Sequence, residues 1–336
     1  MNYRIILSRG LHKDWTLRKV VIKMERKKLL NKAFSRGYLL TVKNKFYRDW
    51  IHRFVIDETK ADVEGKGDIT SDSVLNGNVV DGVIYSRNGG IVAGIEEVCL
   101  LLRESKIKVK QLKKDGDRIN KGTRLLLIKG NEKNILKSER PILDILSRMS
   151  GIATLTHKLV SMINDKVPIA STRKIEWRYL DKKAVYVGSG YTHRLALWES
   201  ILIKDNHLDA LRKDGVKDAI GVALGRAWKK RKNAVFIEVE TGNEKEAIRA
   251  AEKFKELNVN NDYPCFVMLD NMEPSDIKGI IGRLRKKRLL DNVLIEVSGG
   301  ITPENVKSYS TCGADVLSLG YLTTAVKSLD MKLRVI

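Results

Sequence analysis

Six short apolar runs in the second half of the chain constrain its fold most strongly. Each run is almost continuously apolar, ends at polar or glycine residues, and is followed by a segment with helical periodicity. Near-continuous apolar strands that alternate with helices are typical of a parallel sheet covered on both faces. The runs occupy residues 167–172, 199–204, 234–240, 265–270, 293–300 and 315–320.

Groups able to bind ligands stand where these runs end. They are Arg173 with Lys174, Lys204, Glu240, Asp270, Ser298 with Gly299 and Gly300, and Ser318 with Gly320. In an α/β barrel the carboxyl ends of the strands meet around one mouth, whereas an open doubly wound sheet would spread them along a crevice. Because all six runs end in this way, the pattern favours a barrel with one ligand site.

The stretch from residue 171 to 207 carries a cluster of cations. Its members are Arg173, Lys174, Arg178, His193, Arg194 and Lys204. Cations on loops that a buried scaffold fixes are suited to carboxylates or a diphosphate, with Arg binding bidentately and Lys acting as a point charge. The alternative is a solvated basic loop. His193 beside Arg194 is expected to contact ligand, while His207 is expected to orient or cap a neighbour.

Two carboxylates and two glycine turns complete the candidate site. Glu240 and Asp270 suit Mg²⁺ held together with substrate phosphates or ribose hydroxyls. A general acid/base pair and a purely structural pair remain open. The turns at 298–301 and 318–321 expose backbone N–H groups of the kind that bind phosphate near the last strands of a barrel. The sequence contains no GxxxxGK[ST] loop, which argues against a P-loop enzyme.

The first half predicts a compact α+β module. Strand-like runs at 79–86, 107–112 and 124–130 are separated by Gly and Asp turns, and a helix is expected over 137–163. Arg140 would lie at the start of that helix, where the macrodipole favours acids. It is therefore a candidate for a ligand or partner contact, with a salt bridge as the ordinary alternative.

The net charge of +22 is concentrated near the N-terminus. The first fifty residues hold fourteen Lys or Arg and three acids, and residues 13–35 predict a helix with an apolar stripe that includes Leu17, Val20 and Met24. Such a segment could bind RNA or a partner, or serve in targeting. We favour a solvated appendage, and nucleic acid is a partner candidate that is not favoured.

The chain shows no apolar run long enough to span a membrane and no apolar core of a secretory signal, so a cytoplasmic protein is expected. The three cysteines, Cys99, Cys265 and Cys312, match no metal spacing. We expect each to be a small buried residue.

Several ordered motifs resemble one family, quinolinate phosphoribosyltransferase. The motifs are KGDITSD, DGDRINKG, ERPILDILSRMSGIAT, STRK, KKAVYVGSGYTHR, ILIKDNH, IEVE, LDN, SGGITPENV and ADVLSLGYLT. The resemblance covers the chain from about residue 50 to its end. It implies an N-terminal α/β sandwich over 47–150 and an incomplete, TIM-like α/β barrel over 151–336, which follow the basic extension over 1–46. It also implies homodimers or higher oligomers.

The resemblance further implies transfer of a phosphoribosyl group from phosphoribosyl diphosphate to quinolinate, with Mg²⁺. Diphosphate and CO₂ leave, and nicotinate mononucleotide forms. Lys174 resembles the residue that faces the diphosphate, and Glu240 and Asp270 resemble the ribose and metal carboxylates. The positions that resemble the quinolinate site are Arg140 (from the neighbouring subunit), Arg173, His193, Arg194 and Lys204. Those that resemble the phosphate cradle are Ser298, Gly299, Gly300 and Gly320.

The chain departs from the family pattern at four places. IEWR follows TRK where the family has a longer TTPGLR-like turn, and this adds Glu176, which would need Arg178 or Lys204 to neutralise it. GSG replaces GGG, Asp144 replaces an amide, and Leu322-Thr323-Thr324 replaces LTH. Two alternatives to quinolinate transfer therefore stand: a related enzyme with another aromatic acid or base as acceptor, and a non-catalytic barrel that binds RNA or a partner.

Overall fold

The computed structural model describes the backbone from residue 15 and the side chains from residue 21. The expectations for residues 1–14 and for the side chains of Leu17 and Val20 lie outside the described residues. The chain forms two compact units, each assembled from three segments. The described part of the first is 15–34, 196–299 and 308–317, and the second is 35–195, 300–307 and 318–336.

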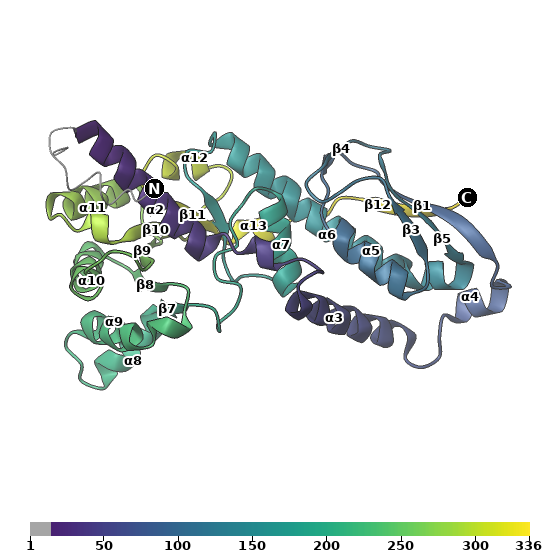
Figure 1. The fold of residues 1–336 in the computed structure, drawn as a ribbon, viewed down its shortest axis with the longest axis horizontal. Coiled ribbons are helices and arrows are strands. Elements are labelled where there is room, and N and C mark those ends of the chain that lie inside the picture. The colour runs from purple at the N-terminus through teal and green to yellow at the C-terminus, as the bar shows by residue number, and fades with distance from the viewer. Residues whose placement is uncertain (1–14) are drawn as a thin grey trace, which may run out of the picture. The chain divides into compact units, whose positions relative to one another are not determined.

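The first unit is built on a parallel sheet. Its strands are β7 (Ile201–Ile203), β8 (Ile237–Thr241), β9 (Cys265–Asp270) and β10 (Leu294–Ser298), each paired with the next in parallel. The helices that connect these strands are α8 (Asp205–Lys213), α9 (Ala219–Lys229), α10 (Glu244–Leu257) and α11 (Pro274–Lys286), labelled beside the strands in Figure 1. The predicted runs therefore form parallel strands, and the buried Val267 and Ile295 belong to their core.

The helix α2 (Trp15–Phe34) belongs to the core of the first unit. Leu30, Ala33 and Phe34 are buried, and the Phe34 ring stacks on Phe266 with ring centroids 4.6 Å apart. The expectation of an appendage is therefore wrong, although the lysines of its basic face, Lys23, Lys27, Lys28 and Lys32, are exposed as predicted. Met24, which the sequence placed on the apolar stripe, is 64% exposed.

The second unit contains a four-stranded antiparallel sheet in the order β12-β1-β5-β3. The strands are β1 (Val79–Ser86), β3 (Lys108–Gln111), β5 (Arg124–Asn131) and β12 (Met331–Val335), and β2 (Gly90–Ile91) pairs separately with β4 (Arg118–Ile119). The helices α5 (Ile95–Glu104) and α6 (Glu132–Met162) lie along the four-stranded sheet (Figure 1). The C-terminal strand thus returns to the small sheet, with Leu333 opposite Ile84.

The chain has further helices and strands, most of them short. They are η1 (Gly37–Leu39), α3 (Lys45–Val63), α4 (Ile69–Val74), β6 (Ile169–Ser171), α7 (Arg178–Val187), η2 (Arg231–Asn233), η3 (Leu290–Asn292), α12 (Val306–Tyr309), β11 (Val316–Leu319) and α13 (Tyr321–Thr324). The predicted fold class, an α/β sandwich with an incomplete barrel, is confirmed.

One helix prediction was wrong in its bounds. The helix expected over 137–163 begins at Glu132, where the Asn131 side chain accepts hydrogen bonds from the N–H groups of Lys133 and Asn134. Arg140 therefore lies in the third turn and not at the helix start.

None of the described helices is long and apolar enough to cross a membrane. The three cysteines are buried free thiols, as predicted.

Candidate functional site

In the first unit, Lys204 and Glu240 lie beside each other at the carboxyl ends of β7 and β8. The Lys204 Nζ is 3.0 Å from Glu240 Oε2, and the Glu240 side chain is 13% exposed. The backbone N–H of Lys204 donates to Nδ1 of His207 over 2.9 Å, so His207 caps α8 as the sequence predicted. The cation and the carboxylate are therefore held at one edge of the sheet.

Asp270 and Ser298 lie opposite each other at the ends of β9 and β10. The amide of Asn271 donates to Asp270 Oδ2 over 2.6 Å, and its backbone N–H donates to the Ser298 carbonyl over 3.0 Å. Gly299 follows with φ of +90°, and a Cβ there would lie 2.3 Å from Asn271 Oδ1. Only glycine fits, so the backbone of this predicted phosphate turn is fixed by its neighbours.

Sequence reasoning missed two glutamates in the strands. Glu238 and Glu296 are fully buried, two residues before Glu240 and Ser298. Because side chains alternate along a strand, they point to the same face of the sheet as those two site residues. The motif IEVE, in which Glu alternates with apolar residues, could have indicated Glu238, because an apolar strand seldom carries a buried acid without a role.

In the second unit, Lys174 lies against Gly320. A Cβ on Gly320 would be 3.1 Å from Lys174 Cδ, so the lysine stem packs on the glycine backbone. The hydroxyl of Thr323 donates to the Lys174 carbonyl, and the hydroxyl of Thr324 to the Gly320 carbonyl over 3.1 Å. The structure therefore brings the predicted catalytic lysine to the predicted phosphate turn, while Arg173 is exposed beside it.

His193 and Arg194 are buried in a fixed loop. Their exposed fractions are 5% and 4%, and Nδ1 of His193 accepts from the Arg194 N–H over 2.6 Å. The hydroxyl of Ser171 and the ammonium of Lys182 both donate to the Thr192 carbonyl just before them. The loop is therefore fixed by its own hydrogen bonds, and guanidinium and imidazole N–H groups held in this way suit recognition of an anion.

The shortened turn after Lys174 is organised by Arg148, which sequence reasoning also missed. Arg148 binds the fully buried Asp181 through two hydrogen bonds of 2.8 and 2.9 Å. Asp181 accepts from the N–H groups of Glu176 and Trp177, and Arg148 pairs with the Glu176 carboxylate at 2.8 Å. Glu176 is therefore neutralised by Arg148, and the expectation of Arg178 or Lys204 in this role was wrong.

Two predicted residues stand apart within the second unit. Arg140 is 70% exposed and its guanidinium lies 3.3 Å from Asp144 Oδ1, one helical turn further along α6. Gly300 is exposed with φ of +62°, and nothing lies within 4 Å of a Cβ placed on it. An exposed arginine is available for a contact with another molecule.

The donor set at the strand ends of the first unit fits magnesium. Glu240 and Asp270 offer carboxylate oxygens, and both side chains are partly exposed. Mg²⁺ prefers hard oxygen ligands and is commonly bound by one or two carboxylates together with substrate phosphates. The two residues therefore suit a metal that is shared with a phosphorylated substrate.

Each unit carries groups of the kind that α/β-barrel enzymes use for anionic, phosphorylated substrates. The first has carboxylates and a glycine turn at strand ends, and the second has a lysine beside a glycine turn and an arginine in a fixed loop. Residues 68–150 match the N-terminal domain of quinolinate phosphoribosyl transferase, and residues 152–334 match its C-terminal domain. The chain belongs to the quinolinate phosphoribosyltransferase family.

Relatives support the same family. A probable nicotinate-nucleotide pyrophosphorylase (carboxylating) of Methanothermobacter thermautotrophicus is 35% identical over 284 residues, which cover 82% of this chain and 95% of the relative. The Bacillus subtilis protein of that name is 34% identical, covering 81% and 89%. The nicotinate-nucleotide pyrophosphorylase structure from Francisella tularensis has a TM-score of 0.71 at 30% identity, covering 86% of this chain and 96% of that one.

Proposed function

We propose that this enzyme converts quinolinate and phosphoribosyl diphosphate to nicotinate mononucleotide, diphosphate and CO₂, a step in NAD biosynthesis. The observation that carries the proposal is the match of both family domains over 68–334, with the predicted charged residues present at their motif positions. The names of the relatives describe the same carboxylating pyrophosphorylase chemistry.

The proposed roles are those that the resemblance to the family implies, and the charges of the residues agree with them. Arg173, His193, Arg194 and Lys204 bind the two carboxylates of the acceptor. Lys174 stabilises the diphosphate, which leaves with the electron pair of the C1–O bond as the ring nitrogen bonds to C1. Glu240 and Asp270 stabilise the developing positive charge on the ribose. The backbone N–H groups from Ser298 to Gly300 and at Gly320 bind phosphate.

Magnesium, when bound through Glu240 and Asp270, would neutralise phosphate charge and orient the diphosphate. Arg140 would complete the acceptor site of a neighbouring subunit in a homodimer, which its exposure allows. The proposed location is the cytoplasm.

The test is product formation by the purified protein with quinolinate, phosphoribosyl diphosphate and Mg²⁺. Nicotinate mononucleotide and CO₂ should form in equal amounts. Lys174→Ala should lower the rate by about 10²- to 10³-fold, as loss of one charge-stabilising donor does. Lys110→Ala, which removes an exposed lysine from β3, should leave the rate unchanged. Absence of product from the folded wild-type protein would refute the proposal.

One observation favours a second candidate, a related transferase with a different acceptor. The turn at Ile175–Trp177 is shorter than the family's and carries an acid beside the acceptor residues. The Glu176 carboxylate pairs with Arg148, which reduces its repulsion of an acidic acceptor. Quinolinate therefore remains the proposed acceptor.

A further inference from the structure

The first unit carries a basic surface at the amino ends of its strands, away from the carboxyl ends that hold the site. The connection from α9 through η2 enters β8, and that from α11 through η3 enters β10. Both connections are rich in exposed cations. Their exposed members are Lys229, Lys230, Lys232, Lys286, Lys287 and Arg288.

Hydrogen bonds join these connections to each other and to α2. The Tyr263 hydroxyl contacts the carbonyls of Arg231 (3.1 Å) and Ala234 (2.7 Å). The Asn261 amide, two residues earlier, donates to the Asp291 carbonyl over 2.6 Å. Arg26 of α2 donates to the Leu290 carbonyl over 2.6 Å. The connections and α2 therefore form one continuous surface, which we call the amino-end face.

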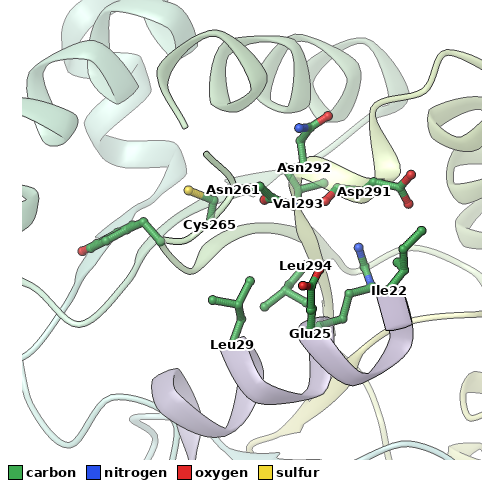
Figure 2. Close-up of a pocket in the computed structure, with 11 residues that line it drawn as sticks. Ile22, Glu25, Leu29, Asn261, Cys265, Asp291, Asn292, Val293 and Leu294 are labelled. Carbon is green, nitrogen blue, oxygen red and sulfur yellow. Dashed lines mark hydrogen bonds between the residues drawn. The ribbon is translucent and has the colours of Figure 1, made fainter. Parts of the chain in front are cut away.

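The helix α2 adds further cations to the amino-end face. Figure 2 shows the side of α2 that carries Ile22, Glu25 and Leu29 turned toward Val293 and Leu294 at the start of β10. The exposed cations of this helix are Lys23, Lys27, Lys28 and Lys32. The exposed acids in α2, in the two connections and in the loop 258–264 before β9 are Glu25, Asp262 and Asp291, so positive charge predominates.

The helix macrodipole does not account for this charge. It favours a cation in the last helical turn, which covers Lys229 of α9 and Lys286 of α11, and the effect falls off beyond that turn. Lys230 and Lys287 follow the helix ends, and Lys27 lies in the middle of α2. A protein surface on which positive charge is concentrated attracts polyanions, and binding of a polyanion would explain these cations.

The geometry points to nucleic acid and not to a membrane surface. A membrane-binding helix inserts its apolar side, whereas Leu30, Ala33 and Phe34 of α2 are buried inside the first unit. Aromatic rings lie within the basic connections, since Trp228 packs edge-on against Tyr263 and under the Arg231 guanidinium. Cations interleaved with aromatic rings are typical of surfaces that bind single strands through phosphates and stacking.

We propose that the amino-end face binds single-stranded nucleic acid through its phosphates, without sequence preference, in addition to the catalytic role. Binding of this kind is weak at physiological salt, with dissociation constants of about 10⁻⁴ to 10⁻⁶ M, and depends steeply on ionic strength.

The experiment measures fluorescence anisotropy of labelled oligouridylate and oligothymidylate strands over a salt series, with nicotinate mononucleotide saturating the catalytic site. Two variants each remove three charges from the amino-end face: Lys229→Gln with Lys230→Gln and Lys232→Gln, and Lys286→Gln with Lys287→Gln and Arg288→Gln. The matched control replaces three exposed lysines of the second unit, Lys108→Gln with Lys110→Gln and Lys114→Gln.

Each variant of the amino-end face should weaken binding about tenfold at low salt and reduce the slope of log Kd against log salt by about 2, which corresponds to three lost single-strand phosphate contacts. The control should change neither value. All three variants should keep wild-type formation of nicotinate mononucleotide, so this proposal can fail while the proposed function stands.

Three results would overturn the proposal. The control could lose as much affinity as the two face variants, which would mean that only net charge matters. Phosphoribosyl diphosphate could displace the strand, which would place it in the catalytic site. The wild type could bind phosphatidylserine vesicles in a sedimentation assay and no oligonucleotide, which would identify an acidic lipid surface as the partner.

Discussion

At the scale of single residues, the departures from the family pattern are accommodated by local contacts. Ser189 of the GSG turn is exposed with φ of +72°, a conformation that costs about 1 to 2 kcal/mol for a residue other than glycine. Its neighbours have no such freedom, because a Cβ on Gly188 would lie 2.5 Å from the Ala153 carbonyl oxygen. The substitution occurs at the position of the turn that has room for a side chain.

Arg148 is the residue on which the shortened turn depends most. Arg148→Met should destabilise the protein by about 3 to 5 kcal/mol, because it leaves the buried Asp181 carboxylate without its cation. Arg140→Met removes an exposed arginine from the same helix and should change stability by less than about 1 kcal/mol. Urea unfolding of both variants measures the difference, and equal stability of the two would contradict it.

A buried ion cluster should make stability depend on pH. Lys183 lies among Glu96, Glu97 and Asp115, and the Tyr47 hydroxyl donates to Glu97 over 2.8 Å. Burial raises the pKa of Glu97 and of Asp115, and the Lys183 charge opposes this rise. An acid whose pKa is higher in the folded protein than in the unfolded chain stabilises the folded protein at pH values below the pKa of the unfolded chain. This stabilisation is lost as the pH rises through the pKa of the folded protein.

Lys183→Met should remove the opposing charge and raise both pKa values further. The variant should therefore lose about 3 to 5 kcal/mol at about pH 7, and less at about pH 4.5, where the carboxyls hold their protons. Lys110→Met is the exposed-lysine control. Unfolding curves at the two pH values measure how much stability the variant loses at each. A larger loss of stability at the lower pH would contradict the prediction.

At the scale of elements, α2 is an integral helix of the parallel-sheet unit. Phe34→Ala should destabilise the protein by about 3 to 5 kcal/mol, since it opens a cavity between Phe266 and Phe236. Met24→Ala on the exposed side of the same helix should cost less than about 0.5 kcal/mol. Denaturant unfolding compares the two, and a small loss for Phe34→Ala would mean that α2 is dispensable.

Periodicity and run length predicted the strands β1, β5, β7, β9 and β10 because these signals are local. The pairing of β12 with β1 was not predicted, since the register of strands so far apart in sequence is set by tertiary packing. Arg148 was missed for the same reason: its partner Asp181 is 33 residues away. The site residues at strand ends could be proposed because parallel strands place those ends together.

At the scale of the whole molecule, the proposed homodimer places Arg140 in the site of the neighbouring subunit. Arg140→Ala and Lys174→Ala should each be inactive alone. When the two are mixed and allowed to exchange subunits, about a quarter of wild-type activity should return, because half of the dimers are hybrids and each hybrid has one complete site. Activity that stays at the level of the separate variants would place Arg140 in its own subunit's site or outside any site.

The cations from Arg173 to Lys204 are proposed to select a dicarboxylate acceptor. Release of diphosphate should be measured with a panel of aromatic acids and bases, quinolinate and nicotinate among them, and compared as kcat/KM. Quinolinate should exceed nicotinate by about 10²-fold or more, because nicotinate lacks the second carboxylate that these residues are proposed to bind. Equal or better use of nicotinate, or of another acceptor, would contradict the assignment of quinolinate.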